Sequence, residues 1–180
     1  PPGVVEHQTR PAGQDPHFWT DPVTVKAILP SLIDALCARM PAHCSTFQTN
    51  GSASAARIDT LHNRLRQRMK PLQERSVLLA TPFFQYFLHR YDLALAGVIE
   101  PIPGAEIAPQ TLQDIIQTTR HQEIAAILAS QQHSDRMAQT VSEATGIPLI
   151  RLDPIGDEQG ASTYEALVLN NAHWLLKALN

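Results

Sequence analysis

The sequence is poor in cysteine and glycine and contains no long apolar run. Only 2 cysteines and 8 glycines occur among its 180 residues. No stretch approaches the ~18 consecutive apolar residues of a membrane-spanning helix, and the opening residues, Pro1-Pro2-Gly3, are not typical of a signal sequence. The formal net charge of -3 provides no overall basic field of the kind that draws proteins to nucleic acid. We therefore expect a soluble chain with no nucleic-acid partner and no membrane span, whose targeting segment was removed or lies upstream.

Several common functional motifs are also absent. There is no glycine-rich phosphate loop and no Gly-x-Ser-x-Gly turn, which disfavours nucleotide binding and serine hydrolysis. His-Glu-x-x-His and Cys-x-x-Cys are missing as well, which disfavours a structural zinc site. The two cysteines, Cys37 and Cys44, are spaced so that they either form a disulfide in an oxidising compartment or pack as reduced thiols, and the sequence leaves both open.

Apolar periodicity predicts the fold. Residues 23–40 and about 45–72 carry apolar side chains at helical spacing, with a kink expected at Pro30. After residue 75, short apolar runs alternate with helical patterns. The expected strands are 76–80, 93–98, 124–129 and 148–152, and the expected helices are 83–91, 109–122, 134–145 and 162–179. This alternation predicts an α/β fold with a four-stranded parallel sheet flanked by helices on both faces.

The long helix and the turn after it hold six of the 14 basic residues: Arg57, Arg64, Arg66, Arg68, Lys70 and Arg75. A solvated helix face is the simpler interpretation of this cluster. An anion-binding or partner-binding patch is the alternative, although no aromatic residues interleave with the charges as a single-strand nucleic-acid binder would need.

Candidate ligand-binding residues gather where the predicted strands end, because parallel sheets bind ligands beyond their carboxyl ends. These positions hold Thr81, the loop 99–106, the segment 130–133 and the turn 153–156. A histidine, His17, lies far upstream in the segment 15–22, DPHFWTDP. Scattered nitrogen and oxygen donors on loops suit a metal site built from imidazole and carboxylate groups of distant segments. Taken alone, His17 can equally pack or cap the next helix, and Asp153 can simply begin a turn.

Taken in order, the motifs resemble the later part of the zinc/manganese-type ABC-transporter substrate-binding proteins. The residues that carry the resemblance are DPHFWTDP at 15–22, PGAE at 103–106, LDPIG at 152–156, and Thr163-Tyr164 with Asn171. The resemblance implies two α/β lobes joined by one long rigid helix, with the metal held between them. On this mapping, residues 1–42 are the tail of the first lobe, 43–75 the linking helix and 76–180 the second lobe, and most of the first lobe is missing from the chain.

The same resemblance implies the metal ligands. His17 matches the histidine of the Asp-Pro-His motif, and Asp153 matches the carboxylate after the last strand. Thr81 stands where the family usually has His or Glu, and a neutral hydroxyl is a poor donor for zinc. His133, on the same sheet edge, and His7, in the lead-in, are candidates to compensate.

Two further positions complete the site that the resemblance implies. Ser130 replaces a frequent acidic residue of the family. Glu106 is expected to cap its helix or orient its loop rather than to bind metal.

The implied function is that of a periplasmic or cell-surface receptor that captures Zn²⁺, or alternatively Mn²⁺, and passes it to a membrane ABC permease without bond chemistry. Two other classes remain open. A metal-independent protein-interaction module is favoured by the loss of a ligand at Thr81. An α/β enzyme would use Asp153, Glu106 and His133 as acid and base groups, but the sequence identifies no nucleophile, substrate or cofactor for it.

Overall fold

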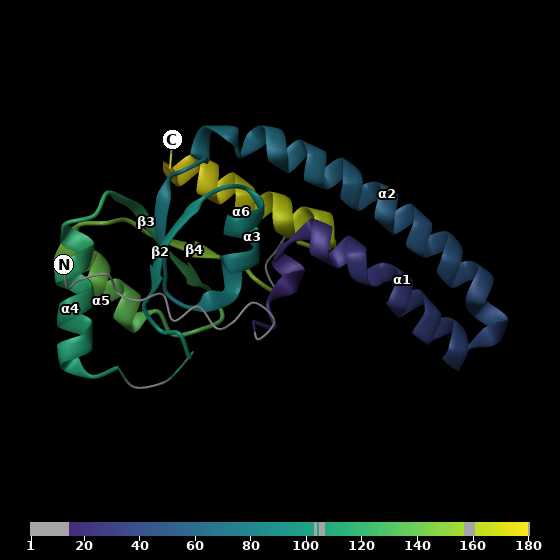
Figure 1. The fold of residues 1–180 in the computed structure, drawn as a ribbon, viewed down its shortest axis with the longest axis horizontal. Helices are drawn as coiled ribbons and strands as arrows, with labels where there is room; N and C mark the ends of the chain where they lie inside the picture. The colour runs from purple at the N-terminus through teal and green to yellow at the C-terminus, as the bar shows by residue number, and fades with distance from the viewer. Residues whose placement is uncertain (1–14, 103, 105–106, 157–160, 180) are drawn as a thin grey trace.

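A parallel sheet covered by helices on both faces forms the main body of the chain, and a helical hairpin projects from it (Figure 1). The structure is a computed structural model that describes residues 15–102, 104, 107–156 and 161–179. The sheet contains β1 (Ser76–Leu79), β2 (Ala94–Val98), β3 (Ile124–Ser130) and β4 (Leu149–Leu152). They are joined in the order β2-β1-β3-β4, and each neighbouring pair is parallel. The predicted α/β class and the four predicted strands are thus confirmed.

Alternating side chains of the strands divide the core into two layers. Val77 and Leu79 of β1 pack with α2 (Cys44–Arg68), α3 (Gln85–Arg90) and α6 (Tyr164–Leu179) on one face. Leu78 and Ala80 pack with α4 (Pro109–Arg120) and α5 (Arg136–Thr145) on the other. Because β3 is covered on both faces, its sequence IAAILAS is almost continuously apolar, as a central parallel strand requires.

The hairpin consists of α1 (Pro22–Arg39) and the first part of α2. Helix α1 continues through Pro30 and ends just before Pro41. A 3-10 turn (Pro41–His43) leads into α2, and a disulfide between Cys37 and Cys44 links the two helices. Of the two alternatives that the sequence left open for these cysteines, the structure contains the bridge.

The end of the long helix, predicted at 45–72, differs most from the sequence prediction, while the other helix boundaries differ by one or two residues. Helix α2 ends at Arg68 and is followed by a separate 3-10 turn, Lys70–Leu72. Pro71 explains the break, because proline has no N–H to donate to the carbonyl four residues earlier and its ring clashes with that carbonyl. Two other short 3-10 turns, Phe18–Thr20 and Pro82–Phe84, precede α1 and α3. Among the described residues, no helix is both long enough and apolar enough to cross a membrane.

A buried ion pair ties the start of α1 to α3. Asp21 is only 2% exposed and caps α1 by accepting a hydrogen bond from the backbone N–H of Val23 at 2.9 Å. The guanidinium of Arg90 donates to the same carboxylate, with an Nη2 to Oδ2 distance of 2.7 Å. Burial alone would raise the pKa of Asp21, but the hydrogen bonds from Arg90, Thr24 and Val23 outweigh it, so the pKa is lowered from its ordinary 3.8.

Replacing Arg90 with Leu should lower the free energy of unfolding by about 2 kcal/mol at neutral pH, because it leaves a buried carboxylate without its charged donor. A lowered pKa stabilises the fold above the ordinary value of 3.8 and loses that effect as the pH falls through the lowered value. Urea denaturation should therefore show the variant and the unmodified protein converging in acid. Arg136→Leu, on the exposed surface of α5, is the control, and an equal loss in this variant would contradict the interpretation.

Candidate metal site

The segment that carries His17 is fastened to the carboxyl end of the sheet by long-range hydrogen bonds. The indole Nε1 of Trp19 donates to the carbonyl oxygen of Pro154 at 2.8 Å. The hydroxyl of Tyr164 donates to the carbonyl oxygen of Trp19 at 2.9 Å, and that of Tyr86 donates to the carbonyl oxygen of Asp15 at 3.2 Å. The histidine motif and the turn after β4 thus lie side by side although 135 residues separate Trp19 from Pro154.

His17 is 9% exposed, and its ring is held by a carboxylate. Nδ1 lies 2.5 Å from Oδ1 of Asp15, and an ionised carboxylate only accepts hydrogen bonds, so Nδ1 carries the proton. Nε2 is then the nitrogen with a free lone pair, and no described residue bonds to it. The ring packs edge-on against Phe83 and Trp19, at centroid distances of 4.2 and 5.3 Å. A carboxylate on the far nitrogen is the usual support of a metal-binding imidazole.

Asp153 is 6% exposed, and only one of its two oxygens is used by the fold. Oδ1 accepts hydrogen bonds from Gln132 Nε2 at 2.8 Å and from the backbone N–H groups of Ile155 at 3.0 Å and Gly156 at 2.8 Å. Asn171 fixes the backbone of Asp153 by donating to its carbonyl at 2.6 Å and accepting from its N–H at 2.9 Å. The other oxygen, Oδ2, is buried without a partner among the described residues. Such an atom is costly unless a ligand compensates it.

The carboxyl ends of all four strands carry buried polar residues. In sheet order these are Glu100 after β2, Thr81 after β1, Ser130 at the end of β3 and Asp153 after β4. The sequence analysis did not single out Glu100 as a buried carboxylate. Its position directly after an apolar strand, like that of Asp153, was the signal that could have identified it. Its Oε2 accepts a 3.4 Å hydrogen bond from the N–H of Gly104, so it holds the following loop.

The other residues considered for the site are His133, His7 and Glu106. His133 is exposed, and its ring lies 4.9 Å from that of Phe83, which also contacts His17. His7 and Glu106 lie outside the described residues. Within the part of the chain that the structure describes, no three His, Cys, Asp or Glu side chains come together as a metal-binding group. Among the described residues, the unpartnered atoms of this edge are Nε2 of His17 and the buried carboxylate oxygens Oδ2 of Asp15 and Oδ2 of Asp153.

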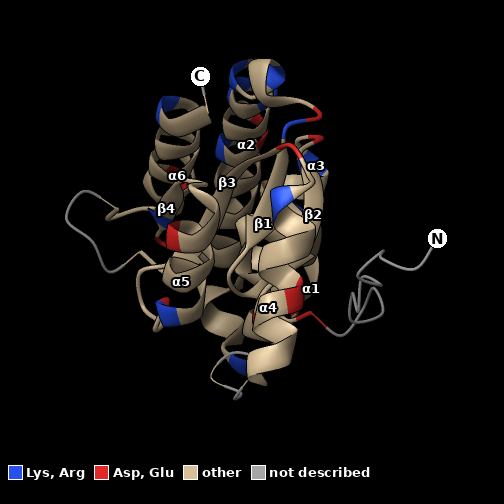
Figure 2. Ribbon diagram, turned by 90° about the vertical axis from the view of Figure 1, so that its left-hand side faces the viewer, with Lys and Arg blue, Asp and Glu red and all other residues tan. Residues whose placement is uncertain are grey.

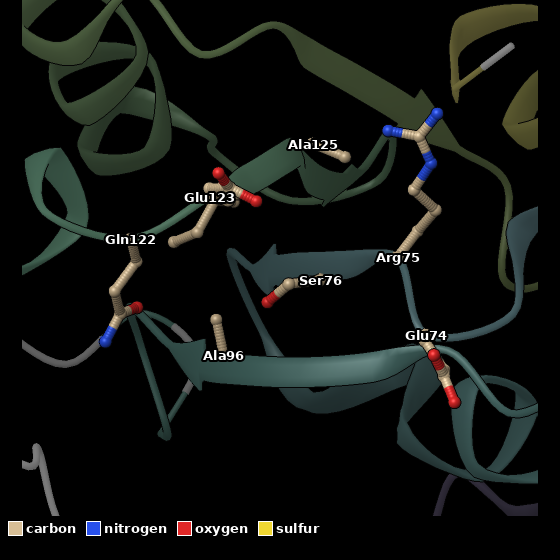
Figure 3. Close-up of a pocket in the computed structure, with 8 residues that line it drawn as sticks. Glu74, Arg75, Ser76, Ala96, Gln122, Glu123 and Ala125 are labelled. Carbon is tan, nitrogen blue, oxygen red and sulfur yellow. The ribbon is translucent and has the colours of Figure 1, made fainter.

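An open cavity of about 750 Å³ lies at the other end of the sheet, around the starts of β1 and β3 (Figure 3). Its charged lining residues are Glu74, Arg75 and Glu123. Figure 3 shows the side chains of the neighbours Glu74 and Arg75 pointing away from each other. Because its charged groups do not converge and the unpartnered donors lie at the opposite end, this cavity is not the candidate metal site.

Comparison with known proteins assigns the family. Residues 2–178 match the family model described as ZnuA, zinc-uptake complex component A, periplasmic. The chain therefore belongs to this family of metal ABC-transporter substrate-binding proteins. These are binding proteins and not enzymes, so the class predicted from the motifs is confirmed.

Individual relatives align with nearly the whole chain. The chain is 25% identical over 168 residues to the high-affinity zinc uptake system protein ZnuA of Brucella suis, an alignment that covers 92% of this chain and 50% of the relative. It is 27% identical over 160 residues to the iron-binding protein YfeA of Yersinia pestis, with coverages of 86% and 51%. The chain thus spans about half the length of these relatives.

Solved structures share the fold. A crystal structure of ZnuA matches with a TM-score of 0.78 at 24% sequence identity, covering 92% of this chain and 60% of that one. The laminin-binding protein Lbp of Streptococcus pyogenes matches with a TM-score of 0.79 at 24% identity, with coverages of 92% and 66%. At this level of identity the likeness concerns the architecture alone.

The contact between Asp15 and His17 predicts a single imidazole tautomer. Proton–nitrogen correlation NMR of the neutral imidazole should show the proton on Nδ1 and a bare Nε2. Asp15→Ala should give a mixture, because the acceptor that selects the tautomer is gone. Asp114→Ala, on the exposed side of α4, should change nothing. A proton on Nε2 in the unmodified protein would contradict this geometry.

Proposed function

We propose that the chain is the later part of an extracytoplasmic receptor that captures a divalent transition metal for an ABC permease, with His17 and Asp153 among the ligands. One observation carries the proposal. Two neighbouring segments are joined by the hydrogen bond between Trp19 and Pro154. One presents Nε2 of His17, to which no described residue bonds, and the other presents Oδ2 of Asp153, which is buried without a described partner. Family membership supports metal capture as the purpose of this pair.

The donor chemistry favours zinc over manganese. A neutral imidazole nitrogen suits Zn²⁺ and other later transition metals, whereas Mn²⁺ prefers an all-oxygen set. The family description and the Brucella suis relative name zinc, but the Yersinia pestis relative is named for iron. We therefore propose Zn²⁺ as the preferred cargo and Mn²⁺ as the second candidate. The metal is the cargo of such a receptor and undergoes no reaction there.

The remaining metal ligands are proposed to come from residues other than His17 and Asp153. The chain spans about half the length of its relatives, so the division into a first-lobe tail (1–42), a linking helix (43–75) and a second lobe (76–180) leaves room for donors from a first lobe. His7 and His133 are further candidates. Thr81 contributes at most a weak hydroxyl contact, since it is neutral and buried.

Two features support a location outside the cytoplasm. The disulfide between Cys37 and Cys44 is typical of an oxidising compartment. The family description reads periplasmic, and a relative in Streptococcus mutans, SloC, is named a substrate-binding lipoprotein. We propose the periplasm or the outer surface of the cell membrane as the site of action.

Competitive chelator titration of the metal-stripped, full-length protein should show tight one-to-one zinc binding. His17→Ala and Asp153→Ala should each weaken it by roughly 100-fold or more, since each removes one of few ligands. Affinity should fall in acid, because zinc competes with protons for both groups. His121→Ala and Asp114→Ala, on exposed surface, serve as controls. If the folded protein shows no zinc or manganese binding, metal capture is wrong and a metal-independent interaction module takes its place.

Thr81 offers a gain-of-function test. Thr81→His should tighten zinc binding by roughly 10-fold, because it restores an imidazole at the carboxyl end of β1. Thr81→Val, which removes only the hydroxyl, should leave the affinity unchanged, and Thr81→Glu is the second variant if the larger ring impairs folding. Thermal melting of the metal-free variants checks their folding. A large loss of affinity in Thr81→Val would show instead that the hydroxyl itself is needed.

A further inference from the structure

A glutamine that follows β3 reaches the carboxylate that follows β4. The two strands are neighbours in the sheet (Figure 2). Ser130 at the end of β3 pairs with Leu152 at the end of β4, which places the residues after them side by side. The amide Nε2 of Gln132 donates to Oδ1 of Asp153 at 2.8 Å. This contact joins the two strand ends beside the candidate metal site.

Ser130 fixes which end of the Gln132 amide faces Asp153. The hydroxyl of Ser130 donates to Oε1 of Gln132 at 2.9 Å and accepts from the backbone N–H of Gln132 at 3.2 Å. Ser130 is only 4% exposed, so this pairing is shielded from water. Because Oε1 accepts from the hydroxyl, the end that faces the carboxylate is Nε2, which only donates. Asp153 is therefore held by a neutral donor of fixed orientation.

The protein uses Oδ1 of Asp153 fully. The backbone N–H groups of Ile155 and Gly156 also donate to it, at 3.0 and 2.8 Å. Gly156 makes this turn possible, because its φ of 86° is a left-handed conformation that glycine adopts without strain. A carboxylate oxygen offers about two lone-pair sites. The two N–H groups belong to consecutive residues of one turn and the Gln132 amide comes from the other strand, so together they occupy both sites.

We propose that Ser130 and Gln132 are positioning residues that make Asp153 bind its metal through Oδ2 alone and thereby favour Zn²⁺ over Mn²⁺. The inference rests on the proposed metal-binding function. Oδ2 of Asp153 is buried without a partner among the described residues, so it is the oxygen left for an ion.

The coordination chemistry of the two ions explains the selectivity. Zn²⁺ in proteins is typically tetrahedral, with four ligand atoms. Mn²⁺ favours an octahedral set of oxygen atoms, and a carboxylate that binds through both oxygens supplies two of them. By holding Oδ1, Ser130 and Gln132 deny Mn²⁺ that second oxygen, whereas a tetrahedral Zn²⁺ needs only Oδ2.

Competitive titration of the metal-stripped, full-length protein with zinc chloride and manganese chloride tests the proposal. Sites of nitrogen and oxygen donors generally bind Zn²⁺ more tightly than Mn²⁺, so the informative quantity is the change in the ratio of the two affinities. Gln132→Leu keeps a side chain of similar size without the amide donor and should lower the zinc-to-manganese ratio by roughly 10-fold. Ser130→Ala should lower it by less, because the amide remains but its orientation is no longer fixed.

A matched control is available on α5. Nε2 of Gln139 donates to the carboxylate of Glu143 at 3.0 Å on exposed surface, so Gln139→Leu removes the same kind of hydrogen bond away from the site and should leave the ratio unchanged. Thermal melting of the metal-free variants checks their folding. Gln132→Asn, whose shorter side chain should not reach Oδ1, is the second variant if Gln132→Leu folds poorly.

Infrared difference spectra of protein labelled with ¹³C-aspartate supply a second readout, because the two carboxylate stretching bands are spaced differently in one-oxygen and two-oxygen binding. Manganese should bind the unmodified protein through one oxygen of Asp153 and the Gln132→Leu variant through both.

Three results would overturn the proposal while leaving metal capture intact. These are an unchanged ratio in the folded Gln132 variants, an equal fall of the ratio in Gln139→Leu, or the same loss of affinity for both ions in Gln132→Leu, which would show that Gln132 supports the site without selecting the metal. If the unmodified protein binds no zinc, the proposed function and this inference are both wrong.

Discussion

The hydrogen bond from the indole of Trp19 to the carbonyl of Pro154 is the contact on which the candidate site depends. It fixes a segment from the start of the chain to the turn that follows the last strand. Tyr164 and Tyr86 add hydrogen bonds to the same segment, and the ion pair between Asp21 and Arg90 secures the helix that follows. Without this fastening, His17 would belong to a loose lead-in and Asp153 would be an isolated carboxylate at the edge of a sheet.

Both proposed ligands are prepared in the same way, with one polar atom held by the protein and the other left free. Asp15 holds Nδ1 of His17, and Gln132 with two backbone N–H groups holds Oδ1 of Asp153. A buried polar atom without a partner destabilises the folded protein. Two neighbouring segments each retain such an atom, Oδ2 of Asp15 and Oδ2 of Asp153, as is expected of a site that a cation completes. The aromatic rings around His17 keep its orientation fixed.

Much of the fold could be predicted because buried strands such as β3 are apolar throughout and helices such as α5 keep their period. The end of α2 was misplaced because the pattern of Leu65, Met69 and Leu72 continues across Pro71, which the helix cannot do. The state of Cys37 and Cys44 depends on their three-dimensional distance, which spacing alone leaves open. The contact between Asp15 and His17 was missed for the same reason, whereas Glu100 was missed although it directly follows an apolar strand.

Anomalous diffraction from crystals of the zinc-loaded, full-length protein at the zinc absorption edge tests most directly whether His17 and Asp153 bind the metal. A single strong peak is expected about 2.0–2.2 Å from both Nε2 of His17 and Oδ2 of Asp153, with Nδ1 still bonded to Asp15. A fully occupied zinc ion elsewhere, with these two atoms unliganded, would contradict it.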